Sequence, residues 1–175
     1  LRRAETLIEK FKKARVLVIG DLIMDHFIWG KVRRISPEAP VPVVEVTSES
    51  IVLGGSANVV NNIHSLGGRA SVTGVIGADN EGRRLVEMLR EKGIEADGII
   101  KDATRPTTIK TRIIAHSQQM VRFDREMKDK IGPDTTAKVL SYIKRAAKAA
   151  DLVVISDYAK GLITRELVEE ANAVC

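Results

Sequence analysis

Hydrophobic residues recur along the chain with two spacings that alternate. Continuous aliphatic runs bounded by turn residues predict buried parallel strands over residues 15–19, 70–76, 98–101 and 151–155. Apolar residues at i, i+3 and i+4 predict helices over residues 4–13, from 54–55 to 67–68, over 80–92, around 139–143 with Asp134 as the cap, and over 162–174. This order predicts an α/β fold in which helices flank a parallel sheet.

The segment from about residue 25 to about residue 53 has a different pattern. It is rich in β-formers, and its three prolines within residues 37–42 exclude a helix and disfavour a central strand. Two further strand patterns, separated by a turn at residues 116–117, lie within about 107–124. We expect these two segments to form antiparallel strands outside the main sheet, inserted in a single domain.

Charge and composition exclude several classes of function. The net charge is +5, but basic and acidic residues alternate, and aromatic residues make up only 3% of the chain. So few aromatics give no platform for stacking bases, and we expect no nucleic-acid partner. The apolar runs are too short to span a bilayer and residues 1–5 show no secretory signal, so we expect no membrane partner. Cys175 is a lone cysteine that cannot form an internal disulfide, which indicates a cytoplasmic protein.

Acidic residues follow three of the predicted strands. Asp21, Asp79 and Asp157 each stand just past such a strand, and Asp25 follows Asp21 closely. Parallel strands place their carboxyl ends at one edge of the sheet, where ligands bind. The first two carboxylates, Asp21 and Asp25, have the spacing to accept hydrogen bonds from vicinal sugar hydroxyls. They are equally suited to satisfying the backbone N–H groups of a turn, and the pattern leaves both interpretations open.

The run Gly54-Gly55-Ser56-Ala57-Asn58 begins a predicted helix. Its glycines allow a ligand to approach the backbone closely, and the free N–H groups of the first turn favour polar or anionic groups. Asn58 adds a donor and an acceptor for a polyol. A plain helix-start turn is the alternative. The chain contains neither the G-x-G-x-x-G dinucleotide pattern nor a G-x-x-x-x-G-K-[ST] phosphate loop.

Basic side chains provide candidates for binding a phosphate group. The alternating pattern of residues 107–112 places Lys110 and Arg112 near each other, and Arg122 lies on the following strand. Together they can bind phosphate by charge-assisted hydrogen bonds, or they face solvent as ordinary sheet residues. Asp157 and Lys160 share one turn and can contact a hydroxyl and a phosphate, or form a surface ion pair. The three histidines lack metal-ligand spacing, so we expect no metal site.

Taken together, these motifs resemble the ribokinase (PfkB) family along essentially the whole chain. Gly20-Asp21, the run at 54–58 and the run at 74–82 occur in that family's order. Within the family, residues 34–44 and 156–161 and the pair Gln118-Gln119 with Arg122 resemble the heptose 7-phosphate kinases of bifunctional ADP-heptose-synthesising proteins.

The resemblance implies a ribokinase-like sheet with a small β-sheet lid over the sugar. It implies transfer of the ATP γ-phosphate, with Mg²⁺, to the anomeric hydroxyl of D-glycero-D-manno-heptose 7-phosphate, a precursor of ADP-heptose and lipopolysaccharide. The partners it implies are this small sugar phosphate and a second copy, in a homodimer formed through the lid. The substrate-binding set that follows from the resemblance and the motifs is Asp21, Asp25, Gly54, Gly55, Asn58, Lys110, Arg112, Arg122, Asp157 and Lys160.

One departure from the family pattern limits this expectation. The family's catalytic Gly-Ala-Gly-Asp turn, whose Asp is the base, has no match in residues 1–175, and neither has its Asn-x-x-Glu segment. We therefore expect the chain to be a truncated, amino-terminal part of such a kinase, without its catalytic residue and inactive alone. Two alternatives stay open: a PfkB kinase for a hexose or ribose, and a non-catalytic dimerisation module.

Overall fold

The main sheet contains four parallel strands. A computed structural model describes residues 10–174, so residues 4–9 of the helix expected over 4–13 lie outside the described residues, and Lys10 and Phe11 are helical. The strands are β1 (Arg15–Gly20), β4 (Arg69–Gly77), β5 (Glu95–Asp102) and β8 (Leu152–Ser156), in the order β5-β4-β1-β8. They confirm the predicted aliphatic strands. β8 is an edge strand, and the side chains of Leu152 and Ile155 on it are exposed.

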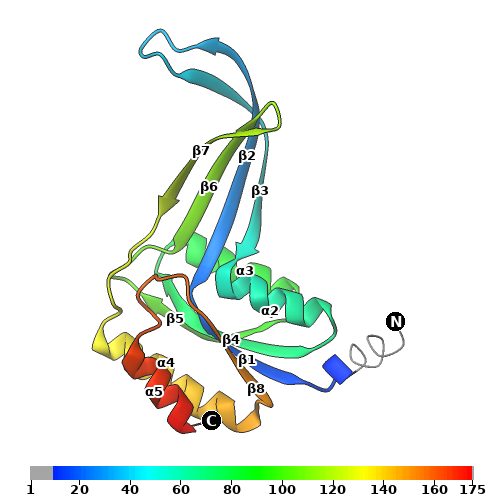
Figure 1. The fold of residues 1–175 in the computed structure, drawn as a ribbon, viewed down its shortest axis with the longest axis vertical. Coiled ribbons are helices and arrows are strands. Elements are labelled where there is room, and N and C mark those ends of the chain that lie inside the picture. Colours follow the sequence, from blue (N-terminus) through cyan, green and yellow to red (C-terminus); the bar gives the residue numbers. More distant parts are fainter. Residues whose placement is uncertain (1–9, 175) are drawn as a thin grey trace.

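Helices cover both faces of this sheet. Helices α2 (Gly55–Ser65) and α3 (Asn80–Glu91) lie on one face, and α4 (Pro133–Ala146) and α5 (Arg165–Val174) lie on the other, with the short 3₁₀ helix η1 (Ala147–Ala149) after α4 (Figure 1). The alternation of β1 explains this arrangement, because successive residues of a strand point to opposite faces. Val16 and Val18 pack under α2 and α3, whereas Leu17 and Ile19 pack against α4 and α5. The predicted α/β fold is confirmed.

Two helix starts differ from the prediction. Asp134 does not cap α4, because the helix begins at Pro133 and Gly132 takes the cap position. Asp134 instead lies in the first turn, where its charge complements the helix dipole. The last helix begins at Arg165 rather than at Leu162, which is a buried loop residue.

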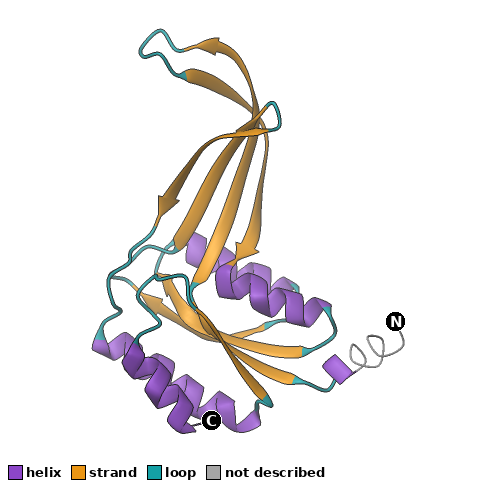
Figure 2. Cartoon of the chain, viewed as in Figure 1, coloured by secondary structure: helices purple, strands orange, loops and turns teal. Residues whose placement is uncertain are grey.

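A second sheet projects from the carboxyl edge of the main sheet (Figure 2). It contains β2 (Leu22–Ile35), β3 (Pro42–Gly54), β6 (Thr108–Ala115) and β7 (Gln118–Arg125), in the order β3-β2-β6-β7. The β2–β3 and β6–β7 pairs are antiparallel, and β2 and β6 are parallel. His116 and Ser117 form the β6–β7 turn with positive φ angles of 50° and 61°. The pairing of β2 with β6 stops at Gly30, so the outer part of the β2–β3 hairpin extends as a two-stranded ribbon.

Candidate functional site

The two sheets join at the end of β1, where the first two predicted carboxylates lie. Asp21 separates β1 from β2, and its backbone carbonyl accepts a hydrogen bond of 2.9 Å from the N–H of Ser56 at the start of α2. Gly55 adopts φ +53°, and a Cβ at this position would collide with the Asp21 carbonyl. The glycine pair therefore allows the start of α2 to pack directly on the β1–β2 junction.

The carboxylate of Asp21 points into the protein. The residue is 4% exposed, and its Oδ2 accepts hydrogen bonds from the backbone N–H groups of Tyr158 at 2.8 Å and Lys160 at 3.2 Å. Burial raises the pKa of this carboxyl group, and the two backbone hydrogen bonds oppose that rise only in part. These contacts are those of a turn carboxylate, one of the two interpretations that the sequence left open.

Asp25 lies on a more accessible surface. Its carboxylate contacts Arg112, with Nη1 and Oδ1 2.5 Å apart, and both side chains keep 22% exposure. A Cβ on Gly54 would collide with this carboxylate, so the glycine makes room for it. Asn58 is exposed in the first turn of α2. Asp25, the glycine pair and Asn58 thus lie along one short path from β2 to α2.

The strand register places the predicted cations on the same face of the second sheet as Asp25. Asp25 is opposite Lys110, Lys110 is opposite Asp124, and Arg112 is opposite Arg122. Directly opposed residues of neighbouring strands point to the same side. We call this surface the Asp25 face. It carries three cations and two carboxylates, which leaves one excess positive charge.

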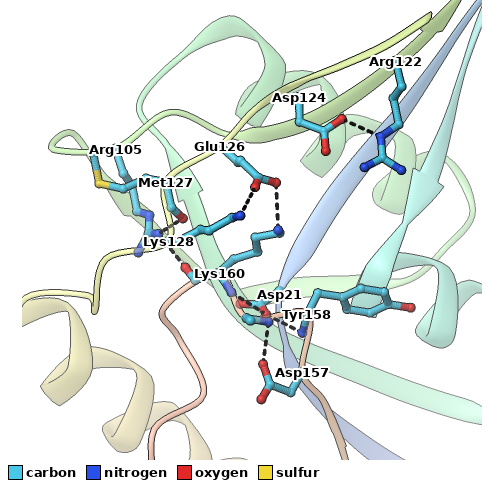
Figure 3. A network of polar contacts seen from close by, with 11 residues as sticks. Asp21, Arg105, Arg122, Asp124, Glu126, Met127, Lys128, Asp157, Tyr158 and Lys160 are labelled. Atoms are coloured by element: carbon cyan, nitrogen blue, oxygen red, sulfur yellow. Dashed lines mark hydrogen bonds and ion pairs between the residues drawn. The ribbon is translucent and has the colours of Figure 1, made fainter.

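Aromatic rings fix two of these cations in place. The guanidinium of Arg112 lies 5.2 Å from the ring centroid of Phe27, and the ammonium of Lys110 lies 5.6 Å from that of Tyr158. Arg122 forms an ion pair with Asp124, with Nε and Oδ1 3.1 Å apart (Figure 3). Tyr158 comes from the loop after β8, so this contact brings the loop to the Asp25 face.

The remaining two predicted residues have different surroundings. Asp157 is exposed and accepts a hydrogen bond of 2.7 Å from the N–H of Ala159. Lys160 forms an ion pair of 2.8 Å with Glu126, and their side chains are only 11% and 14% exposed (Figure 3). Glu126, rather than Asp157, is thus the ion-pair partner of Lys160.

A cavity of about 450 Å³ lies on the opposite face of the second sheet, against the start of α3. Its wall includes the His26–Glu49 pair, with Nε2 and Oε2 2.8 Å apart, together with Arg84 and Phe123. Asp25 and Lys110 do not line it, because the β2 and β6 residues that do are their sequence neighbours and point to the other side. The strand-end chemistry and this cavity are therefore separate features.

Comparison with known proteins assigns the chain to a family. The family model described as "pfkB family carbohydrate kinase" matches residues 13–175. The chain belongs to the pfkB family.

Curated relatives of this pfkB chain are considerably longer. It is 44% identical over 172 residues to the bifunctional protein HldE of Geobacter sulfurreducens, an alignment that covers 98% of this chain and 35% of the relative. It is 49% identical over 160 residues to HldE of Helicobacter pylori strain 26695, covering 91% of this chain and 35% of that protein. The chain thus spans about a third of the length of these relatives.

Solved structures confirm the ribokinase-like pfkB fold. Phosphofructokinase-2 from Escherichia coli, in a tetrameric inhibited form, superposes with a TM-score of 0.65 at 16% identity, covering 91% of this chain and 52% of that one. Ribokinase from Giardia lamblia superposes with a TM-score of 0.63 at 20% identity, covering 92% and 51%. At these identities the likeness concerns the fold alone.

The pfkB chain contains site residues that the sequence pattern did not reveal. Asp124 is on the Asp25 face, and the period of two in β7 places it there with Arg122. Tyr158 and Phe27 position cations, and Glu126 and Arg105 contact the loop after β8. Nothing in the local pattern marks Glu126 or Arg105, since their partners are distant in the sequence.

Within residues 10–174, no group of three or more His, Cys, Asp or Glu side chains has an arrangement that could hold a metal ion. Among the helices that the structure describes, none is both long and apolar enough to cross a membrane.

Proposed function

We propose that this chain is the sugar-phosphate-binding part of a kinase that phosphorylates the anomeric hydroxyl of D-glycero-D-manno-heptose 7-phosphate. The observation that carries the proposal is the excess positive charge of the Asp25 face, where Arg112 and Arg122 stand opposite each other. Membership of the pfkB family supports a carbohydrate kinase, and the high identity to HldE proteins supports the subgroup that the segment Arg34–Val44 resembles.

The hydroxyl end of the sugar has its partners along the path from β2 to α2. The carboxylate of Asp25 accepts hydrogen bonds from sugar hydroxyls, and the close backbone approach at Gly54 and Gly55 admits the ring near the start of α2. Asn58, exposed in that first turn, donates and accepts at a further hydroxyl. Asp21 supports this surface from below through the loop after β8.

The phosphate end lies further along the second sheet. Two arginines directly opposite each other on neighbouring strands repel, which is unfavourable unless an anion bridges them. A phosphate dianion between Arg112 and Arg122 accepts charge-assisted hydrogen bonds from both guanidinium groups. Lys110, held over Tyr158, adds a third cation within the same face.

The second sheet acts as the lid in this proposal, and the segments about 25–53 and about 107–124 supply it. Its opposite face carries exposed apolar side chains, including Val46, Val121 and Phe123, which supports a homodimer formed through the lid. ATP and Mg²⁺ belong to the proposed reaction, but we assign no residue of this chain to them and none to the catalytic base. A cytoplasmic location and a role in making ADP-heptose for lipopolysaccharide complete the proposal.

Isothermal titration calorimetry on the 175-residue chain tests it with three ligands: heptose 7-phosphate, heptose, and inorganic phosphate. We expect heptose 7-phosphate to bind tightest, Asn58→Ala to weaken both sugars, and Arg122→Gln to weaken only the phosphorylated one. Asn172→Ala, on the exposed part of α5, is the matched control for Asn58→Ala. A chain with an intact far-ultraviolet circular dichroism spectrum that binds none of the three ligands would refute the proposal. Stronger binding of ribose or fructose 6-phosphate would transfer it to another pfkB kinase.

A further inference from the structure

Four chain connections link the second sheet to the main unit, and three of them contact one loop. The connections are Asp21 between β1 and β2, the Gly54-Gly55 step between β3 and α2, residues 103–107 between β5 and β6, and residues 126–132 between β7 and α4. The loop is residues 157–161, which follow β8 and carry Tyr158 to the Asp25 face.

Lys160 makes contacts with three of these connections. Its backbone N–H donates to Asp21, its ammonium forms the ion pair with Glu126, and its carbonyl oxygen accepts a hydrogen bond of 2.6 Å from Nη2 of Arg105 (Figure 3). The same Nη2 also donates to the carbonyl of Met127 at 2.9 Å. Asp21 reaches the fourth connection through its hydrogen bond with the N–H of Ser56.

The following residue reinforces this arrangement. Gly161 adopts φ +87°, and a Cβ there would collide with the carbonyl of Asp129. Its own carbonyl accepts a hydrogen bond of 3.1 Å from the N–H of Ile131. The loop after β8 is therefore packed tightly along the connection from β7 to α4, although the two are far apart in the sequence.

The Glu126–Lys160 pair is largely shielded from solvent. Both side chains are nearly buried, so removing one partner leaves a charge with little access to water. The chain offers a contrast in Lys144 and Glu170, an ion pair of 3.3 Å between α4 and α5 in which both side chains are more than half exposed.

We propose that Lys160 is a positioning residue that couples the placement of the second sheet to the loop after β8, and through Tyr158 to Lys110 on the Asp25 face. It does not touch the substrate. A shift of the β7–α4 connection moves Glu126, the Glu126–Lys160 pair moves the loop, and the loop carries the ring against which Lys110 rests. The link to substrate rests on the proposed function, but the mechanical coupling does not.

Residue-resolved hydrogen exchange by NMR on the 175-residue chain tests the coupling. In Glu126→Gln we expect the amides of Tyr158 and Lys160, which donate to Asp21, to lose at least about tenfold in protection while the amide of Leu17 in β1 keeps its own. Glu170→Gln is the matched control and should leave all three amides unchanged. The charge exchange Glu126→Lys with Lys160→Glu should restore protection. Unchanged exchange at Tyr158 and Lys160 in Glu126→Gln would overturn the proposal.

Two further measurements keep the test decisive. If Glu126→Gln unfolds, the amide of Leu17 also loses protection; Glu126→Asp then replaces it, and a loss confined to Tyr158 and Lys160 is required. Calorimetry with heptose 7-phosphate should show about tenfold weaker binding for Glu126→Gln, full affinity for Glu170→Gln and recovery in the charge exchange. Unaltered affinity despite lost protection would refute the positioning role. Absence of binding to the unmodified chain would refute the proposed function, and the exchange result would still decide the coupling.

Discussion

Arg112 and Arg122 stand directly opposite each other across β6 and β7, on the face that carries Asp25. Each has a carboxylate partner, Asp25 for the first and Asp124 for the second. The two residues are nevertheless cross-strand neighbours of like charge, a pairing that is unfavourable in a free sheet. Binding sites commonly accept such a cost because a ligand of opposite charge relieves it.

Replacing Arg122 by Gln should therefore change stability and binding in different ways. Arg122 is half exposed and Asp124 has Lys110 opposite it as a second cation, so we expect less than about 1 kcal/mol of lost stability. Affinity for heptose 7-phosphate should fall about 10-fold or more, the loss of one charge-assisted hydrogen bond. Thermal melts with and without about 10 mM phosphate separate the two effects, because an anion that binds only the folded chain raises its melting temperature. Arg90→Gln on α3 is the control, and equal stabilisation of both variants by phosphate would contradict the prediction.

A side chain at position 54, even a methyl group, should destabilise the protein. A methyl group there collides with the carboxylate of Asp25, and relief requires that Asp25 leaves Arg112. We expect Gly54→Ala to lower the free energy of unfolding by about 1–3 kcal/mol. Gly132→Ala is the control, because a Cβ at Gly132 meets no atom within 4 Å, so only the weaker helix capping by Ala, about 0.5–1 kcal/mol, is lost. Urea unfolding measures both, and equal losses would show that the crowding at Gly54 relaxes freely.

Asp21 should show a conflict between charge and hydrogen bonding. Because burial raises the pKa of its carboxyl group, its charged form opposes folding, and this contribution worsens as the pH rises through the interval between its unfolded and folded pKa values. Asp21→Asn keeps an acceptor for Tyr158 and Lys160 and removes the charge, so the melting temperature at pH 7 should rise. Asp21→Ala removes the acceptor and should cost about 1–3 kcal/mol. A lower melting temperature for Asp21→Asn at pH 7 than for the unmodified chain would contradict this account.

Acidification should reduce the contribution of Glu126 to stability, which is the opposite of its effect at Asp21. Its hydrogen bond with the Lys160 ammonium lowers the pKa of the Glu126 carboxyl below the ordinary 4.5. The unfolded chain then binds the proton more readily, so the stabilising contribution is complete above about pH 4.5 and is lost as the pH falls through the lowered pKa. Urea unfolding between about pH 3 and pH 7 should give a shallower pH dependence for Glu126→Gln than for the unmodified chain. If the free energy of unfolding depends on pH in the same way for both proteins, the pKa of Glu126 does not differ between the folded and the unfolded chain.

The sequence pattern predicts the parts of this molecule that depend on neighbouring residues. The aliphatic run at 15–19 predicts β1, and the glycine pair with Asn58 predicts the start of α2. The period of two in β6 brings Lys110 and Arg112 to one face, as expected. These features follow from local periodicity and turn chemistry, which the sequence shows directly.

Other features depend on partners that are distant in the sequence. The ammonium of Lys160 is a group that can bind phosphate, but it forms an ion pair with Glu126 in the connection after β7. The carboxylate of Asp21 looked equally suited to a sugar or a turn, and two backbone N–H groups from the loop after β8 now occupy it. A pattern along the chain lists donors and acceptors, but only the tertiary fold decides which of them meet.

The exposed edge of the main sheet has a practical consequence for every experiment above. In the part of the chain that the structure describes, β8 pairs with β1 on one side only, and Leu152 and Ile155 leave apolar surface beside the free side. A free strand edge is a template on which another extended segment can add. The chain should therefore self-associate through β8 as its concentration rises, independently of the second sheet. The Leu152→Lys substitution should remove this association, as sedimentation would show. Any dimer that remains in this variant then forms through the lid.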